Sequence, residues 1–203
     1  MPSLPPNSPA AEAYSLPATS TTEFSADERT YLLKLAHEAI ESALENRPPR
    51  FDPPASHLTK PRGVFTTVYL EQQLRGCVGY VFPVMPLYQA VIETAQAAAT
   101  KDTRFAPVIR QEAPYLQVSL SILSGLTPIT PEQIEIGRHG LVISLAGHRG
   151  LLLPQVPVEH HWDRIQFLEQ TCRKAGLPLN AWKAGATLEA FTAEVFADEG
   201  SPE

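Results

Sequence analysis

Two segments of the chain place their apolar residues at helical spacing. Residues 25–46 predict an amphipathic helix whose core face carries Leu32, Leu35, Ala39, Ile40 and Ala43. Ser25 and Glu28 have the spacing of a capping box, so we expect this helix to begin there. Residues 86–100 predict a second helix, because Pro86 suits a first turn and one face carries Leu87, Val91, Ala95 and Ala98.

Other segments have the composition or the alternation of β-strands. Residues 63–70 are rich in β-branched and aromatic side chains, and Glu71–Gln72 turns the chain back into residues 73–80. Residues 115–123 alternate, with apolar side chains on one side of the predicted strand. Residues 140–147 and 150–156 flank a Gly-His-Arg-Gly segment and predict a hairpin, and residues 191–198 predict a last strand.

Helical spacing returns over residues 158–176, which predict one long helix capped by Gly176. Its buried stripe would carry Val158, Trp162, Ile165, Leu168 and Cys172. Hairpins rather than regular strand–helix–strand units join the strands. The pattern therefore favours the α+β class, with an antiparallel β-sheet flanked by helices and a smaller lobe.

The chain divides into a leader, one domain and a short tail. Residues 1–23 are rich in Pro, Ser, Thr and Ala with little hydrophobic periodicity, which predicts a disordered leader. One domain is expected over residues 24–198, since 203 residues can bury a substantial core. Residues 199–203 then form the tail.

Composition narrows the classes of partner. Hydrophobic residues make up 43% and charged residues 19%, as in soluble globular proteins, and the formal charge of −6 gives no general attraction to nucleic acid. No apolar run approaches the roughly 20 residues of a membrane helix, and the N-terminus does not resemble a secretory signal. Two cysteines are too few for a disulfide framework. We therefore predict a cytoplasmic protein that binds neither nucleic acid nor membrane.

The stretch QLRGCVGY, residues 73–80, carries the most distinctive chemistry. In a regular strand, Arg75 and Cys77 share a face about 7 Å apart, and a nearby guanidinium favours the thiolate over the thiol. Gly76 and Gly79 remove side chains beside the sulfur, so a ligand or another backbone can approach closely. The competing interpretation is an inert cysteine packed as a small hydrophobe, which is our expectation for Cys172.

A carboxylate and a guanidinium follow the alanine-rich helix in KDTRFAP, residues 101–107. Asp102 and Arg104, with Phe105 beside them, could orient a polar substrate. They could equally cap the end of the helix and pair with each other. Both interpretations remain open from the sequence.

A third group of polar residues lies where an apolar strand gives way to a helix. Gln155, Glu159 and His160 are placed to receive an anion or to transfer protons, or simply to form a polar surface. His160 and Asp163 lack an evident third metal ligand. The usual phosphate-loop, dinucleotide, zinc-protease, CxxC and serine-hydrolase motifs are absent, so we predict no metal and no cofactor.

Taken together, these segments resemble the AMMECR-one domain family, known in prokaryotes as AmmeMemoRadiSam system protein A. The resemblance rests on GVF leading into LRGCVG, then on AAATKDTRFAPV, GRHGLVI, RGLLLPQV and WDRIQFLEQTCRKAGLP, followed by Trp182. The segments occur in the family's order from about residue 25 to 197. Val78 stands where isoleucine is usual in the hexapeptide, which is a conservative difference.

The resemblance implies a place for the site more than a reaction. It implies an α+β domain with a smaller lobe and a cleft between the lobes, lined by Arg75, Gly76, Cys77 and Gly79, with Asp102, Arg104 and Phe105 nearby. It also implies Memo-like and radical SAM proteins as partners. The family's biochemical activity is not established.

Two hypotheses follow for the function. In the first, Cys77 is a thiolate nucleophile or redox centre, Arg75 and Arg104 bind a carboxylate or phosphate, and Asp102 or His160 transfers protons. Gln155 and Glu159 would also contact the ligand. In the second, the protein is a non-catalytic module, and the LRGCVG segment shapes a groove that binds a partner protein.

Overall fold

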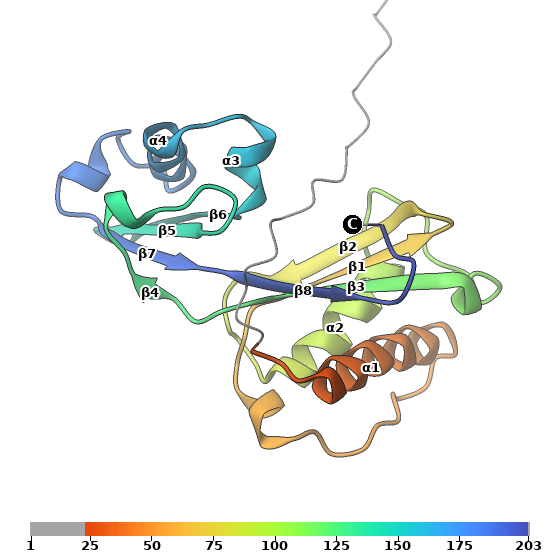
Figure 1. The fold of residues 1–203 in the computed structure, drawn as a ribbon. Coiled ribbons are helices and arrows are strands. Elements are labelled where there is room, and N and C mark those ends of the chain that lie inside the picture. Colours follow the sequence, from red (N-terminus) through yellow and green to blue (C-terminus); the bar gives the residue numbers. More distant parts are fainter. Residues whose placement is uncertain (1–22, 203) are drawn as a thin grey trace, which may run out of the picture.

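The computed structural model describes residues 23–202, and it is built on two antiparallel four-stranded sheets (Figure 1). The first sheet has the order β2 (Gln73–Tyr80), β1 (Val64–Leu70), β3 (Leu116–Leu123) and β8 (Ala193–Ala197). The second has the order β4 (Thr127–Pro128), β7 (Thr187–Phe191), β5 (Gly140–Leu145) and β6 (His148–Leu152). The predicted leader lies outside the described residues except for Glu23.

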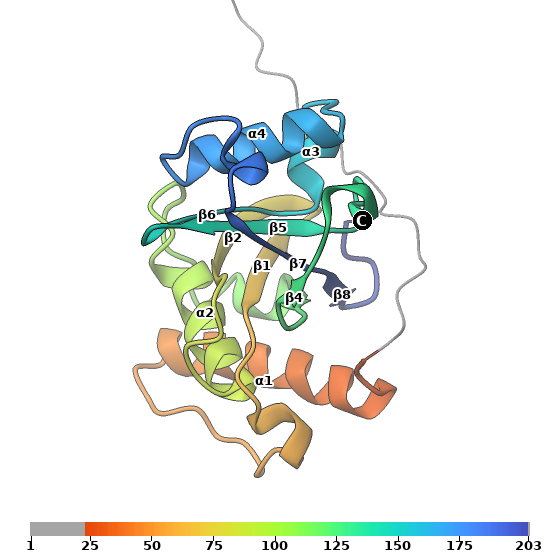
Figure 2. The same cartoon turned by 90° about the vertical axis from the view of Figure 1, so that its left-hand side faces the viewer.

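Helices α1 (Ala26–Leu44) and α2 (Leu87–Thr100) cover one face of the first sheet, as Figures 1 and 2 show. The alternation in residues 115–123 correctly predicted which side of β3 is buried, because it places four side chains in this core: Leu116, Val118, Leu120 and Ile122. The capping box of Ser25 and Glu28 starts α1 as predicted. Both helical stripes therefore pack against the sheet, and we call the opposite side of the first sheet its open face.

The second sheet has its own helix, α4 (Arg164–Lys174), which covers its outer side (Figure 2). Leu141 and Ile143 of β5 are fully buried and belong to the apolar clusters that include Phe167 and Cys172 of α4. Cys172 is thus fully buried, as its apolar stripe predicted. The short helix α3 (Gln155–Glu159) lies between β6 and α4 along the chain.

The predicted single helix over residues 158–176 is wrong, because the chain breaks between α3 and α4. His161 has a positive φ of 53°, and the N–H groups of His161 and Trp162 donate back to carbonyls of α3. Asp163 then caps α4 through a capping box with Gln166. A strong local start signal therefore overrides the apolar spacing, and Ile165 is 44% exposed rather than buried.

The two sheets meet through a small apolar cluster and one continuous segment of chain. The cluster contains Leu123 of the first sheet and Val142 and Phe191 of the second, with Phe65, Val81, Leu126, Leu151, Leu153 and Ala193 packed against it. The chain crosses from β7 to β8 at Thr192, so the predicted last strand is β8 and Phe191 already belongs to the other sheet. Within residues 23–202, no helix is long and apolar enough to cross a membrane.

Candidate functional site

Cys77 lies on the open face of the first sheet, in a row of residues that crosses all four strands. It is paired with Thr67 of β1, Thr67 with Ser119 of β3, and Ser119 with Ala197 of β8. Residues directly opposite each other share a face of the sheet, so these side chains are neighbours. Cys77 is half-buried, whereas Cys172 is buried.

The residue before Cys77 explains why the sulfur faces away from the helices. A Cβ atom added to Gly76 would lie 2.0 Å from the carbonyl oxygen of Ala98 in α2. Gly76 therefore faces the helices and Cys77 the open side. At Gly79, an added Cβ would meet the ring of Phe65 at 2.3 Å. Both glycines are thus needed for packing within the protein, and the expected approach of a ligand or a backbone to the sulfur stays a prediction.

The sulfur of Cys77 has one hydrogen-bond donor among residues 23–202. The Thr67 hydroxyl donates to the Cys77 Sγ atom over 3.2 Å. Tyr69 lies on the same face of β1, where burial raises the pKa of its phenol and the nearby Cys77 adds to the rise. Within residues 23–202, the polar groups near the sulfur thus include the Thr67 hydroxyl, the Tyr69 phenol and the Arg104 guanidinium.

Asp102 and Arg104 hold the backbone of Cys77 at the edge of the sheet. Asp102 Oδ2 accepts the Cys77 backbone N–H at 2.8 Å, and Arg104 Nη2 donates to the Cys77 carbonyl at 3.2 Å. The two side chains also pair at 2.7 Å. Together they cover the free edge of β2 beside Cys77. Neither of the two interpretations drawn from the sequence, substrate orientation or a helix cap with mutual pairing, included this contact with the strand.

This ion pair is asymmetric in its exposure. The Asp102 side chain is only 6% exposed, whereas that of Arg104 is 57% exposed and lies over the ring of Phe105. The hydrogen bond from Arg104 and those from the Cys77 and Arg104 backbones hold the pKa of Asp102 well below its ordinary range, despite burial. The Asp102 carboxylate in turn raises the pKa of Arg104. Asp102 thus stays ionised, and Arg104 presents a fixed cation at the rim of the site.

Arg75 is directed away from the sulfur by an irregularity in the strand. Val68 pairs with Gly76 but Tyr69 pairs with Leu74, so Arg75 is the extra residue of a β-bulge. Its guanidinium donates to both oxygens of Glu112, at 3.1 and 3.0 Å, and to the carbonyls of Ala106 and Pro107. Regular alternation, which placed Arg75 beside the sulfur, fails at this bulge.

Glu112 and Thr67 are residues of the site that the sequence did not reveal. Hydrogen bonds from Arg75 lower the pKa of Glu112 despite some burial, so it remains the anionic partner of Arg75. Glu112 lies 37 positions from Arg75, and no local pattern joins them. Thr67 was recognisable only once the pairing of β1 with β2 was known, because one step in register would turn it to the other face.

Gln155 and Glu159 are exposed on α3, and no hydrogen bond within residues 23–202 joins either of them to the Cys77 group. His160 stacks on Trp162, with the ring centroids 4.6 Å apart. No group of three metal-ligating side chains is found in this part of the chain. The structure therefore joins the first two predicted groups by hydrogen bonds, and none of the hydrogen bonds within residues 23–202 joins the third group to them.

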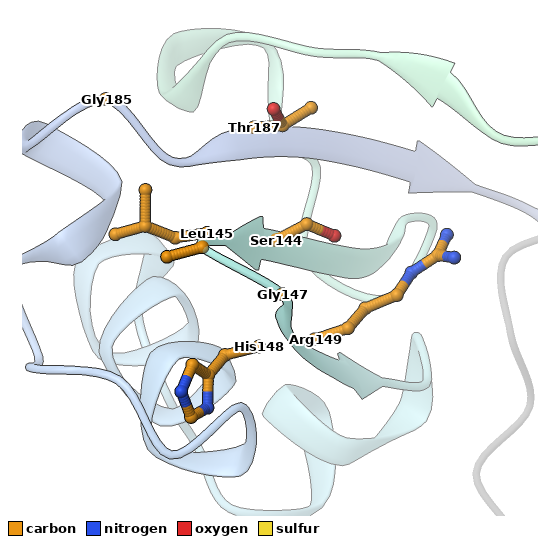
Figure 3. A pocket seen from close by; sticks show the side chains of 8 residues that line it. Ser144, Leu145, Gly147, His148, Arg149, Gly185 and Thr187 are labelled. Carbon is orange, nitrogen blue, oxygen red and sulfur yellow. The ribbon is translucent and has the colours of Figure 1, made fainter.

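A hollow of about 370 Å³ lies on the second sheet, around the turn between β5 and β6 (Figure 3). Ser144, Arg149 and Thr187 line it, and His148 points away from these three side chains. Arg149 also stacks over Phe82, 4.4 Å from the ring centroid. Phe82 lies two residues after the end of β2, so this contact ties the second sheet to the segment that follows the Cys77 strand.

Comparisons with known proteins agree with this architecture. A family model described as AMMECR1 matches residues 33–196. A protein from Thermococcus gammatolerans is 42% identical over 185 residues, which cover 83% of this chain and 89% of the relative. A protein from Thermofilum pendens is 39% identical, and the match covers 86% of this chain and 91% of the relative. The crystal structure of the uncharacterized protein PH0010 from Pyrococcus horikoshii matches with a TM-score of 0.69 and 37% identity, and covers 88% of this chain and 95% of that one.

Proposed function

The chain belongs to the AMMECR1 family, and from this premise we propose that its Cys77 group is a small-molecule site in which the thiol acts as a nucleophile. One observation carries the proposal. The backbone N–H and carbonyl of Cys77 are both held by side chains, and its sulfur accepts a hydrogen bond on an open sheet face. An inert cysteine needs no such support.

The neighbouring residues take different roles in this proposal. Asp102 stays ionised and positions both the Cys77 backbone and Arg104, so it serves as a positioning group rather than a proton donor. Arg104 offers an exposed guanidinium that can bind a carboxylate or phosphate on the ligand. Arg75 contributes indirectly, because it holds residues 106–112 against the strand.

Alkylation of the two cysteines provides the test. We expect iodoacetamide to label Cys77 in the folded protein and to leave Cys172 unlabelled, because Cys172 is fully buried. Mass spectrometry of the digested protein separates the two sites within one molecule. Labelling of Cys77 only after unfolding would rule out the nucleophile.

The charge of the reagent tests the role assigned to Arg104. The quantity compared is the ratio of the iodoacetate rate to the iodoacetamide rate. This ratio should be about threefold larger for Cys77 than for free cysteine, because the Arg104 guanidinium attracts the carboxylate of iodoacetate. Arg104→Gln should remove this preference. Arg138→Gln is the matched control, since Arg138 also pairs with a carboxylate but lies on the second half of the chain. An unchanged preference in Arg104→Gln would contradict the assignment.

We extend the proposal to the setting of the site. A free, reactive thiol requires a reducing compartment, which supports a cytoplasmic location. The family resemblance supports Memo-like and radical SAM proteins as partners, with the ligand held where the two sheets approach each other. Co-purification of a tagged full-length chain with such proteins is the direct test.

A second candidate function is a non-catalytic module that binds a partner protein. It is favoured because the side chains of Arg75 and Asp102 are already hydrogen-bonded within the protein. These hydrogen bonds support β2 whether or not the thiol reacts. Leu74 and Ile109, 42% and 55% exposed, offer apolar surface at the same edge. An unreactive Cys77 in the folded protein would favour this candidate.

A further inference from the structure

We propose that Thr67 is the positioning residue that stabilises the thiolate of Cys77, and this inference rests on the proposed nucleophilic function. The two residues are direct cross-strand partners, and the Thr67 hydroxyl donates to the sulfur over 3.2 Å. A sulfur atom accepts a hydrogen bond more strongly when it carries negative charge. The Thr67 hydroxyl is therefore placed to donate to the sulfur as it attacks a ligand.

The placement of Thr67 makes this contact a fixed one. β1 is paired on both sides, with Cys77 opposite Thr67 on β2 and Ser119 opposite it on β3. The residues flanking Thr67, Thr66 and Val68, are fully buried against the helices. A β-branched side chain in the middle of a sheet has few rotamers, and the hydroxyl has no other hydrogen-bond partner within residues 23–202.

The charged groups around the sulfur are engaged elsewhere. From the edge of the sheet, Arg104 donates to the Cys77 carbonyl and to Asp102. At the bulge, the Arg75 guanidinium is taken by Glu112. On β1, Tyr69 is neutral near pH 7, because burial raises the pKa of its phenol. Within residues 23–202, the Thr67 hydroxyl is thus the group that donates a hydrogen bond to the sulfur, while the Arg104 guanidinium acts on it only through space.

The reaction used as a probe defines what Thr67 would change. Cys77 loses its proton to solvent, the thiolate attacks the methylene carbon of iodoacetamide, a carbon–sulfur bond forms, and iodide leaves with the electron pair of the broken bond. Only the thiolate reacts. The pH dependence of the rate therefore reports how strongly the folded protein favours the thiolate.

The experiment measures the Cys77 alkylation rate against pH in the full chain, with Cys172 as the internal control. Thr67→Val keeps the shape of the side chain and removes the hydroxyl. We expect its profile to move up by about one pH unit, so that labelling near neutral pH slows about tenfold. Thr67→Ser should restore the wild-type profile to within about a factor of two. Ser119→Ala removes the other hydroxyl of the row and should change nothing.

The outcomes separate this inference from the proposed function. If Cys77 is labelled in the folded wild-type protein and Thr67→Val has the same profile, Thr67 has no such role, yet the nucleophile stands. If Thr67→Ser shifts as far as Thr67→Val, the effect is one of packing, and the inference is wrong. If wild-type Cys77 reacts only on unfolding, both proposals fall. Titration of the thiolate by its ultraviolet absorbance gives a second reading that needs no reagent to enter the site.

Discussion

Gly76→Ala should lower the thermal unfolding midpoint by about 6–12 °C. The added methyl would lie 2.0 Å from the carbonyl oxygen of Ala98, and the obstacle is helix backbone rather than a side chain that can rotate away. Overpacking against a fixed backbone costs about 3 kcal/mol, and each kcal/mol shifts the midpoint of a chain of this size by about 2–4 °C. Calorimetry of the full chain measures the change.

Gly125→Ala is the matched control for this substitution. A Cβ at Gly125 has no neighbour within 4 Å, so we expect a midpoint within about 1 °C of the wild-type value. A Gly76→Ala variant as stable as Gly125→Ala would mean that β2 does not lie against α2 as described. It would also release the constraint that turns Cys77 towards the open face.

Features set by neighbouring residues were predictable from the sequence. Ser25 and Glu28 cap α1, and the alternation of residues 115–123 gives the buried side of β3, because caps and pleats depend on residues a few positions apart. The Glu71–Gln72 turn is also local. Both of its residues adopt positive φ, as a type I′ hairpin turn requires.

The parts of the site that were not predictable depend on register and on distant contacts. The bulge at Arg75 has no residue signature in the strand, yet it decides whether the guanidinium meets the sulfur or Glu112. The spacing of Asp102 and Arg104 indicates that the two side chains can pair, as they do. The bond of Asp102 to the Cys77 backbone joins residues 25 positions apart and could not be inferred.

The break before α4 is a different kind of failure. Apolar spacing continued through it, but the capping box of Asp163 and Gln166 starts a new helix within the same stretch. Two local signals competed there, and the cap prevailed because His161 can adopt a left-handed conformation that ends α3. The consequence for function is that Gln155 and Glu159 stand on a short separate helix.

Asp102→Asn should destabilise the protein by about 2–3 kcal/mol at neutral pH. The Asp102 carboxylate is almost fully buried and accepts hydrogen bonds from the Cys77 backbone and from Arg104. An amide replaces one acceptor oxygen by a donor, so a buried donor faces another donor and the guanidinium loses its counter-charge. The exposure of Arg104 keeps the cost below that of a fully buried pair.

The pH dependence of this substitution has a definite sign. Hydrogen bonds in the folded state hold the pKa of Asp102 below its ordinary value of 3.8, so the unfolded chain binds the proton more tightly. The stabilisation is therefore present above about that pH and is lost as the pH falls through the lowered folded value. We expect the stability difference between wild type and Asp102→Asn to be constant near neutrality and to shrink below about pH 4.

Denaturant midpoints are compared for wild type and Asp102→Asn from neutral pH to below about pH 4. All other carboxylates are present in both proteins, so the difference between the midpoints reports Asp102. Asp52→Asn serves as the control, because Asp52 is exposed and its carboxylate makes no hydrogen bond among residues 23–202. Asp102→Asn should also abolish the preference of Cys77 for iodoacetate, since Asp102 holds Arg104 in place. A variant that loses stability but keeps the preference would show that Arg104 is positioned by the Cys77 carbonyl and Phe105 alone. The Asp102 carboxylate would then support the strand and not the ligand.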